Sequence, residues 1–557
     1  MTIKLRMCCD NILTFPMPWQ QIYDPLGNVW LSTLSAALPI CLLFYLLAIR
    51  RTPAHLAAVF ASLLCIALAA FEFGMPFDKI AGAAANGIVY GAIRIGWTLL
   101  AAVFVYELTV ESGHFEVIKQ SIGGITADRR LQTLLIAFSF GAVLEGAGGG
   151  GAPVAICGAM MVGLGFDPFA AAILCLIANT SPVAFGAVGN PVRALVAVTG
   201  LDAMQISATM GRILPWTALI LPFWLTRLVT TWDKVFEVWP GLLVAGVTFG
   251  GIQFYWSNYQ DFGLVDIVGG LGTLIILTWF LKVWKPKNIW RFPNEPPVTV
   301  ELKTYTLGQI THAWTGFLLL SLFVVLSGIP AVVTFLNTAT PIIPVPGLHN
   351  LVFRMPPVFP TPHAEAAIFD LTIFANAGTA AFLAGLISGP ILGLSFGRTL
   401  QVFFQTCRKM QKSMLAIMAM LVLGYVTRYS GMDAVLGLAM THTGVLFPFF
   451  GTIIGWIGVS LTGTDAGSNA LFGSLQVITA TKLGLPPVLM AAANSAGGVM
   501  GKMIAAQSLV VAAAAVGQPG REGDLFRKVL PHSLILASLI GLIVFFLATV
   551  GRSFVPQ

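Results

Sequence analysis

Two acidic residues lie inside apolar stretches of the chain and are the first candidates for chemistry. Glu145 stands in LEGAGGGGAP at 144–153, and Asp465 stands in LTGTDAGSNALF at 461–472. A carboxylate inside a lipid bilayer is costly, and residues of this kind usually serve ion or proton movement. We therefore predict that either Glu145 or Asp465 carries a coupled proton.

Two basic residues are the matching candidates for binding a carboxylate substrate. Lys502 and Arg193 both lie in apolar surroundings that also contain small polar residues. A competing interpretation is structural: an ion pair, Glu145–Lys502 or Asp465–Arg193, would then hold two parts of the chain together.

Glycines and small polar residues next to these charges predict a binding site built on broken helices. Irregular backbone at membrane depth is tolerated only where protein or a water-filled cavity surrounds it. A helix that begins there presents free N–H groups to an anion, and glycine lets the backbone approach a ligand closely. Helix packing is the alternative role of the same residue types. The candidates are Gly149, Gly150, Gly151, Asn179, Thr180, Ser181, Ser468, Asn469, Asn494 and Ser495, together with Lys502.

The two acidic stretches belong to an internal duplication. Each is followed by an apolar run, then by LGFDP at 164–168 or LGLPP at 483–487, and then by an Asn-Thr-Ser or Asn-Ser motif. The offset changes only from 317 (461 minus 144) to 315 (494 minus 179). Such repeats are typical of secondary transporters, whose sites lie mid-membrane at discontinuous helices. We predict repeats at 144–200 and 461–517.

Composition indicates a polytopic α-helical membrane protein. Of 557 residues, 57% are hydrophobic and 10% charged, and the mean hydropathy is +0.86. A membrane helix needs about 20 largely apolar residues, and the sequence predicts about a dozen or more membrane-entering elements. They lie near 31–49, 56–73, 89–110, 131–143, 169–188, 212–230, 236–256, 266–284, 311–335, 372–395, 413–427, 444–461, 485–500 and 532–550. The predicted organisation is an extramembrane segment at 1–30, a first half at 31–284, a basic cytoplasmic loop at 285–310 and a second half at 311–557.

The net charge of +7 fits a membrane protein better than a nucleic-acid-binding one. The basic residues, among them Arg408, Lys409, Lys412, Arg527 and Lys528, are expected in short loops. By the positive-inside rule these loops are cytoplasmic and face anionic lipid, which places both termini on the other side. The seven cysteines and seven histidines show no metal-binding spacing, so we expect no metal and no cofactor.

Several long motifs resemble the bacterial lactate permease family. They are WQQIYDPLGNVWLS at 19–32, LEGAGGGGAPVAI, ANTSPVAFGA, LTGTDAGSNALFGSLQ, AANSAGGVMGKM and DLFRKVLPHSLI. The resemblance runs in order from about residue 18 to the C-terminus. It implies a non-enzymatic inner-membrane proton symporter for L-lactate, D-lactate and glycolate, with two inverted repeats and re-entrant hairpins.

The chain departs from the family pattern near the predicted site. GNPVRAL places Asn190 and Arg193 where the family is generally apolar, and Gly150 stands where the family has phenylalanine. Gln507 matches the glutamine of a family Ser-Pro-Gln-Ser motif. Asn190, Arg193 and Gln507 therefore join the substrate-binding candidates, and we expect a pocket of altered shape.

Two functions from other classes stay open at the level of sequence. A proton-translocating subunit of a respiratory complex would also carry Glu and Lys inside helices, but along successive helices rather than in two repeats. An anion channel would need a pore without alternating access.

Overall fold

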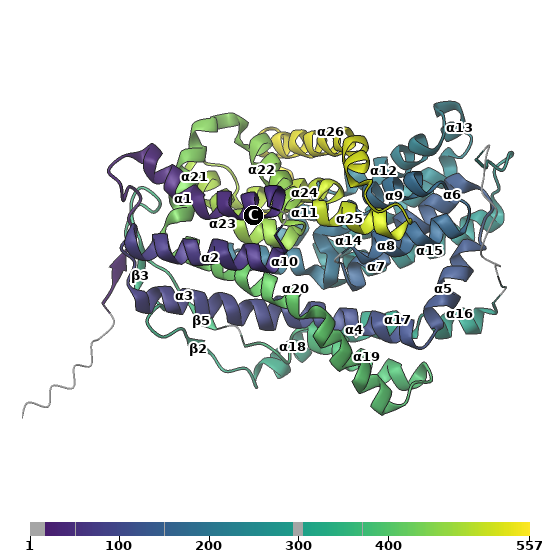
Figure 1. The fold of residues 1–557 in the computed structure, drawn as a ribbon, viewed down its shortest axis with the longest axis horizontal. Helices are drawn as coiled ribbons and strands as arrows, with labels where there is room; N and C mark the ends of the chain where they lie inside the picture. Colours follow the sequence, from purple (N-terminus) through teal and green to yellow (C-terminus); the bar gives the residue numbers. More distant parts are fainter. Residues whose placement is uncertain are drawn as a thin grey trace, which may run out of the picture.

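Helices make up most of the described residues in a computed structural model, which describes residues 17–50, 52–149, 151–292, 303, 305–369 and 371–556 (Figure 1). Within these residues eight helices are long and apolar enough to cross a membrane, or up to 11 if each bent pair forms one span. The predicted all-α polytopic class is confirmed, although about a dozen membrane-entering elements were expected.

The first half begins with long helices and leads into the first repeat. Its opening elements are β1 (Trp19–Gln20), α1 (Val29–Phe44), the π-helical turn η1 (Tyr45–Ile49), α2 (Ala54–Phe71), α3 (Phe77–Tyr90), η2 (Gly91–Gly96), α4 (Trp97–Glu111) and α5 (His114–Gly123). The first repeat follows as α6 (Arg129–Thr133), η3 (Leu134–Phe140), α7 (Gly141–Ala147), α8 (Ala152–Gly163), α9 (Pro168–Ala178), η4 (Val183–Phe185) and α10 (Gly186–Thr199). The half closes with α11 (Ala203–Ile213), α12 (Pro215–Val229), α13 (Trp232–Phe236), α14 (Trp239–Tyr259), η5 (Phe262–Leu264) and α15 (Val265–Val283).

The second half has the same order of long helices followed by a repeat. It opens with α16 (Leu307–Ala313), α17 (Thr315–Gly328) and α18 (Pro330–Asn337), and continues after the strands with α19 (Ala377–Ile391), α20 (Phe396–Ser430), α21 (Met432–Met440) and η6 (Thr441–Leu446). The second repeat comprises α22 (Phe447–Thr462), α23 (Asp465–Lys482), α24 (Pro487–Gly501), η7 (Lys502–Ile504) and α25 (Ala506–Ala515), followed by α26 (Glu522–Thr549) and η8 (Arg552–Phe554).

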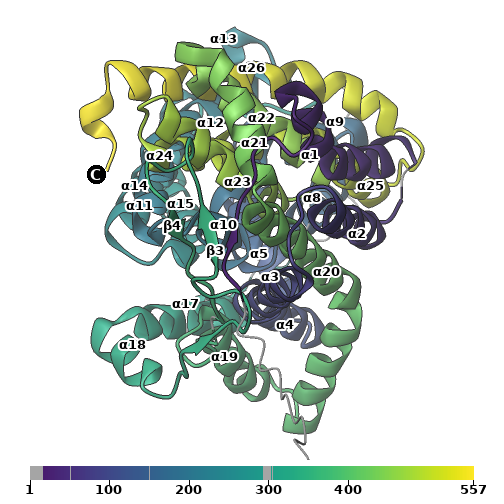
Figure 2. The same ribbon diagram turned by 90° about the vertical axis from the view of Figure 1, so that its left-hand side faces the viewer.

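The connection between α18 and α19, residues 338–376, holds most of the described strands. They are β2 (Ile343–Pro344), β3 (Val352–Arg354), β4 (His363–Ala364) and β5 (Ile368–Phe369). β3 pairs with β1 in parallel and with β4 antiparallel, while β2 pairs with β5. Figure 2 looks onto the end of the molecule that carries these strands, and β3 and β4 cross the middle of that end near α10 and α23. The long connection therefore covers one end of the repeats.

Both repeats consist of a helical hairpin followed by a broken helix. In the first, Cys157 of α8 donates to the carbonyl of Ile136, so α8 folds back along η3. In the second, Ser468 of α23 donates to the carbonyl of Gly455 on α22. Figure 1 shows α6 to α8 in one half of the long axis and α21 to α23 in the other, so the hairpins enter from opposite ends. This is the inverted arrangement with re-entrant hairpins that the family resemblance implied.

The second hairpin packs on α24 through closely spaced glycines. A Cβ on Gly455 would lie 2.0 Å from the carbonyl oxygen of Asn494. On α24, a Cβ on Gly497 would lie 2.1 Å from the carbonyl oxygen of Thr452, and one on Gly501 would lie 2.3 Å from that of Trp456. Small residues four apart let helix backbones touch, which is how membrane helices gain packing energy without a hydrophobic driving force.

The sequence-based placement of some basic residues in loops was wrong. Arg408, Lys409 and Lys412 lie in the middle of α20, a helix of 35 residues, and are exposed. At 1.5 Å per residue this helix is about 50 Å long, which exceeds the hydrocarbon thickness of about 30 Å. The basic half therefore extends beyond the apolar layer, where Lys409 pairs with Glu107 of α4. Arg527 and Lys528 likewise lie in α26 and not in a loop.

Candidate functional site

The first hairpin tip, residues 148–151, brings Glu145 against the broken helix of the same repeat. Gly149 and Gly151 have φ values of 56° and 91°, a left-handed conformation that glycine adopts without steric cost. Gly150 lies outside the described residues. Glu145 is 4% exposed, and a Cβ on Gly186 would lie 2.8 Å from its Oε1 atom. The carboxyl group is thus seated on the backbone of α10.

The break between α9 and α10 contains strained backbone that sequence reasoning missed. The two helical segments meet at 57°, and Ala187, Val188 and Gly189 all have left-handed φ values of 47°, 56° and 77°. Such conformations cost about 1–3 kcal/mol each for residues other than glycine and concentrate at functional sites. A Cβ on Gly149 would lie 3.4 Å from that of Ala187, so the strained segment lies against the first hairpin tip.

Several polar atoms around this break have no hydrogen-bond partner among the described residues. They include the hydroxyl of Ser181, Oε2 of Glu145 and both amide atoms of Asn179, which lies within reach of the Glu145 carboxyl group but forms no bond of standard geometry with it. Thr180, by contrast, donates to the carbonyl of Ile177 at 2.7 Å. Because buried polar groups are nearly always paired, Asn179 and Ser181 retain hydrogen-bonding capacity for a ligand.

The second hairpin tip, residues 463–464, places Asp465 in a comparable position. Gly463 has a φ of 77°, and Asp465 is the first residue of α23. Ser495 of α24 donates to Oδ2 of Asp465, and Asn469 donates to the same atom at 3.5 Å. Oδ1 has no partner in the described part of the chain, and a Cβ on Gly498 would lie 2.4 Å from it. Each repeat therefore seats a buried carboxyl on a glycine of its own broken helix.

Lys502 lies at the end of α24, where the helix breaks, and forms a hydrogen bond with the second hairpin tip. It is 5% exposed, and its Nζ donates to the carbonyl oxygen of Gly463 at 2.8 Å. Its charge acts on both Glu145 and Asp465, although neither carboxylate forms an ion pair with it within the described residues. Neither the alternative Glu145–Lys502 pair nor the alternative Asp465–Arg193 pair occurs in that part of the chain.

Three polar candidates of the second repeat hold helices together. Ser468 donates to the carbonyl of Gly455 at 3.2 Å, and Asn469 donates to that of Pro191 at 3.1 Å. Asn494 donates to Oδ1 of Asn469 at 2.8 Å. These bonds join α22, α23, α24 and α10, which favours the helix-packing alternative for these residues.

Of the three candidates added because the chain matches or departs from family motifs, Asn190 and Arg193 lie on α10 and Gln507 lies on α25. The guanidinium of Arg193 lies 4.9 Å from the ring centre of Phe262, at the start of the segment before α15. Asn190 donates to the carbonyl of Ile95 at 3.4 Å. Gln507 is exposed beside the second hairpin tip, where its side chain is accessible to a ligand.

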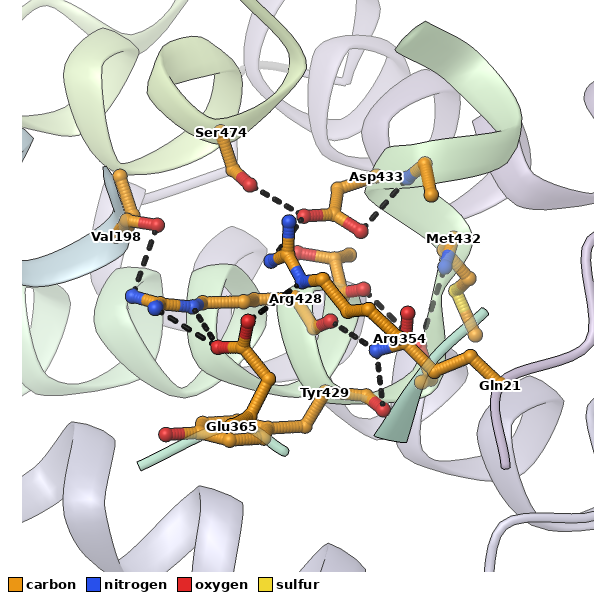
Figure 3. Close-up of polar contacts among 12 residues, drawn as sticks. Gln21, Val198, Arg354, Glu365, Arg428, Tyr429, Met432, Asp433 and Ser474 are labelled. Carbon is orange, nitrogen blue, oxygen red and sulfur yellow. Dashed lines mark hydrogen bonds and ion pairs between the residues drawn. The ribbon is translucent and has the colours of Figure 1, made fainter. Parts of the chain in front are cut away.

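A network of buried charges lies below the long connection and was also missed from sequence (Figure 3). Arg354 of β3 and Arg428 of α20 both pair with Glu365, at 2.8 and 2.9 Å. Arg354 also lies 3.7 Å from Asp433 of α21, which accepts a hydrogen bond from Ser474 of α23. The network joins the long connection to helices of the second half.

Neighbouring hydrogen bonds strengthen this attachment. Gln21, just after β1, donates to the carbonyls of Arg428 and Tyr429 at 2.9 and 3.0 Å. The hydroxyl of Tyr429 donates to the carbonyl of Ala366, and Arg428 also donates to that of Val198 at the end of α10. A cavity of about 250 Å³ lies beside the network, between the long connection and the ends of α10 and α23. Its lining residues include Thr199, Gly200, Arg354, His363, Glu365, Arg428 and Ser474.

Glu365→Gln is expected to destabilise the protein in a pH-dependent manner. Removing one partner of a buried ion pair costs about 3–5 kcal/mol. Burial raises the pKa of Glu365, but Arg428 and Arg354 outweigh this, and the net pKa lies below its ordinary value of 4.5. The stabilisation is therefore present above pH 4.5 and lost as pH falls through the lowered folded pKa. Thermal unfolding in detergent should show a large difference between wild type and variant at pH 7 that shrinks below pH 4.5.

Glu111→Gln is the matched control for that measurement. Glu111 pairs with Arg398 at 2.5 Å, with side chains 35% and 38% exposed, and exposed pairs contribute about 1 kcal/mol or less. Equal unfolding temperatures for wild type and Glu365→Gln at pH 7 would contradict a stabilising role of the buried network.

The arrangement of hairpins, broken helices and buried carboxyl groups defines a multi-pass membrane transporter. A family model described as L-lactate permease matches residues 32–551, and the chain belongs to this family. The family consists of permeases, so the protein is not an enzyme. Within the described residues no three His, Cys, Asp or Glu side chains are grouped so as to hold a metal ion.

Curated relatives match nearly the whole chain. Glycolate permease GlcA of Escherichia coli is 45% identical over 546 residues, which cover 94% of this chain and 97% of that protein. L-lactate permease of Bacillus subtilis is 42% identical over 559 residues, which cover 95% and 98%. Among solved structures, the Alcanivorax borkumensis YdaH transporter, described as having an unusual topology, matches with a TM-score of 0.42 and 13% identity, over 86% of this chain and 88% of that one.

Proposed function

We propose that this protein imports small 2-hydroxymonocarboxylates, namely L-lactate, D-lactate and glycolate, by proton symport across the bacterial inner membrane. The names of its relatives, a glycolate permease and L-lactate permeases, support the substrate class. The observation that carries the coupling is structural. Two buried carboxyl groups, Glu145 and Asp465, stand at opposed hairpin tips within the electrostatic reach of one lysine, Lys502.

In this proposal the substrate carboxylate binds near Lys502 and the backbone of the hairpin tips. Asn179 and Ser181 hydrogen-bond the substrate's polar groups, since no hydrogen bond of standard geometry engages their side-chain atoms within the described residues. Protonation of one buried carboxyl group compensates the charge of the anion, so that loading of the site with substrate and proton adds no net charge. On the side of the membrane where the proton concentration is low, the carboxyl group releases its proton. The carboxylate that results repels the substrate anion and so weakens substrate binding.

Uptake in a host that lacks its own lactate and glycolate permeases tests this function. Labelled L-lactate, D-lactate and glycolate should accumulate, and a protonophore should abolish accumulation. Acetate, which lacks the hydroxyl group, should compete weakly. Saturable uptake that a protonophore leaves unchanged would contradict symport, and unsaturable flux would favour the channel alternative.

The respiratory-subunit alternative receives less support. Its expected feature is a row of acidic and basic residues through successive helices, whereas Glu145, Asp465 and Lys502 all lie at hairpin tips or helix breaks. Membership of a permease family also favours a transporter over a respiratory subunit.

A further inference from the structure

Asp266 is a buried acidic residue that none of the preceding steps uses. It is the second residue of α15 and is 0% exposed. Both of its carboxyl oxygen atoms are buried and lack a hydrogen-bond partner within the described residues. An ionised carboxylate in that state would be strongly destabilising.

The ordinary structural role of an aspartate at a helix start does not account for Asp266. Asp261, five residues earlier, accepts a hydrogen bond from the backbone N–H of Gly263 at 2.7 Å and begins the short helix η5. Asp202 caps α11 in the same way through Gln205, at 2.9 Å. Asp266 accepts no such bond from its own helix.

Asp266 lies directly beside the last turn of α7, which carries Glu145. A Cβ on Gly146 would lie 2.8 Å from the Cβ of Asp266 and 2.9 Å from the backbone nitrogen of Ile267. A Cβ on Gly270 would likewise lie 2.8 Å from the backbone nitrogen of Val143 on α7. The two helices thus touch through glycine backbones, and the charge of Glu145 acts on Asp266.

Few other charges face this pair. α8, α14, α17, η3 and η4, which pack near α7 or α15, contain no charged residue within their described bounds. The remaining charged groups are Arg193 on α10, Asp261 before η5, Lys282 at the opposite end of α15, Glu107 and Glu111 near the end of α4, and Lys502 and Asp465, which interact electrostatically with Glu145. Glu145 Oε2 and both oxygens of Asp266 are therefore buried on two touching helices, without a hydrogen-bond partner among the described residues and with little positive charge nearby.

We propose that Asp266 is a second proton-binding residue of transport and that it shares the coupled proton with Glu145. Two buried carboxyl groups on touching helices, each in the electrostatic field of the other, cannot both ionise cheaply, so a proton bound to one stabilises the pair. Binding converts one carboxylate to a carboxylic acid, and release restores the carboxylate; no other bond changes. This inference rests on the proposed proton symport.

Purified protein in proteoliposomes tests the role of Asp266. Labelled lactate is measured in two modes: accumulation driven by an inward gradient of one pH unit, and counterflow, in which unlabelled lactate exchanges for labelled lactate. Wild type should accumulate lactate up to about tenfold for one proton per substrate. The Asp266→Asn variant should not accumulate lactate, but it should still show counterflow. The KM for lactate in its counterflow should no longer depend on pH. The control Asp202→Asn, an exposed capping residue, should behave as wild type.

The outcomes separate this inference from the function on which it rests. If wild type does not accumulate lactate, the proposed symport fails and this inference fails with it. If wild type accumulates lactate and Asp266→Asn does so equally, with an unchanged pH profile, only the role of Asp266 is overturned. Asp266→Glu, which keeps an ionisable group, should retain coupled accumulation with a shifted pH profile.

A second measurement uses unaltered protein and does not depend on the variant folding. Dicyclohexylcarbodiimide modifies protonated carboxyl groups in apolar surroundings, and mass spectrometry of peptides locates the adduct. At pH 6 we expect adducts on Asp266 in some molecules and on Glu145 in others, with modification of one suppressing modification of the other. Adducts on Glu145 without any adduct on Asp266 would overturn the inference.

Discussion

Glu145→Gln is expected to abolish proton-driven accumulation of lactate while leaving lactate exchange across the membrane. Glutamine keeps the volume of the side chain, which is seated against Gly186 at the first hairpin tip. It cannot bind or release a proton, so it holds the site in the equivalent of its protonated state. A gradient of one pH unit, which supports about tenfold accumulation in wild type, should then support none. Parallel accumulation and counterflow assays in proteoliposomes check this result.

Asp465→Asn is the matched comparison, because Asp465 occupies the corresponding place in the second repeat. It receives hydrogen bonds from Ser495 and Asn469, whereas Glu145 Oε2 has no partner in the described residues. We therefore expect Asp465→Asn to impair accumulation less than Glu145→Gln. Loss of coupling in Asp465→Asn alone would place the proton in the second repeat, and normal accumulation by Glu145→Gln would remove Glu145 from the coupling mechanism.

Lys502→Gln is expected to weaken substrate affinity more than any other single change. Lys502 is buried, lies at the break of the second repeat and is the cation whose charge reaches both carboxyl groups. Loss of one partner of a desolvated charge pair costs about 2–5 kcal/mol, which corresponds to an increase of about 30- to 4,000-fold in apparent Kd. Binding of lactate by isothermal titration to protein in detergent gives this ratio directly.

Lys482→Gln provides the control for charge alone. Lys482 is exposed at the end of α23 and belongs to the same repeat. The affinity of the Lys482→Gln variant for lactate should match that of the wild-type protein. Normal affinity in a folded Lys502→Gln protein would instead assign Lys502 to the hydrogen bond that it donates to Gly463, which closes the second hairpin tip.

The hairpins and broken helices were predictable because their signals are local. Glycines at 148–151 and at Gly463 mark turns, and the ordered recurrence of motifs marks the duplication. Pro168 and Pro487 each follow a short turn and begin a helix, as proline favours. Composition alone was sufficient for the membrane class.

The contacts around the site depend on long-range packing, which sequence patterns do not encode. From sequence, Asp266 is an ordinary first-turn residue of a membrane helix, and only the structure shows that α7 lies beside it. Arg354 and Glu365 read as loop residues, and only the fold of residues 338–376 brings them to Arg428. The left-handed conformation of Ala187 and Val188 has no local signal, because neither residue type favours it.

The polar candidates of the two repeats fall into two groups, those bonded to other helices and those with unpartnered atoms, and residue type alone does not distinguish the groups. Ser468, Asn469 and Asn494 are engaged in bonds between helices, whereas Asn179 and Ser181 retain unpartnered atoms. The corresponding polar residues of the two repeats therefore differ in whether they have hydrogen-bond partners among the described residues. The unpartnered atoms therefore favour Asn179 and Ser181 as ligands of the substrate.

Proton movement driven by a lactate gradient tests the central claim most directly. Proteoliposomes that contain a pH-sensitive dye, with no imposed pH gradient and with potassium and valinomycin to hold the membrane potential at zero, receive external lactate. The account predicts rapid internal acidification that requires the protein, saturates with lactate and is absent in vesicles with Glu145→Gln. The account would be contradicted if labelled lactate entered through the wild-type protein while the vesicle interior became no more acidic than in vesicles with Glu145→Gln.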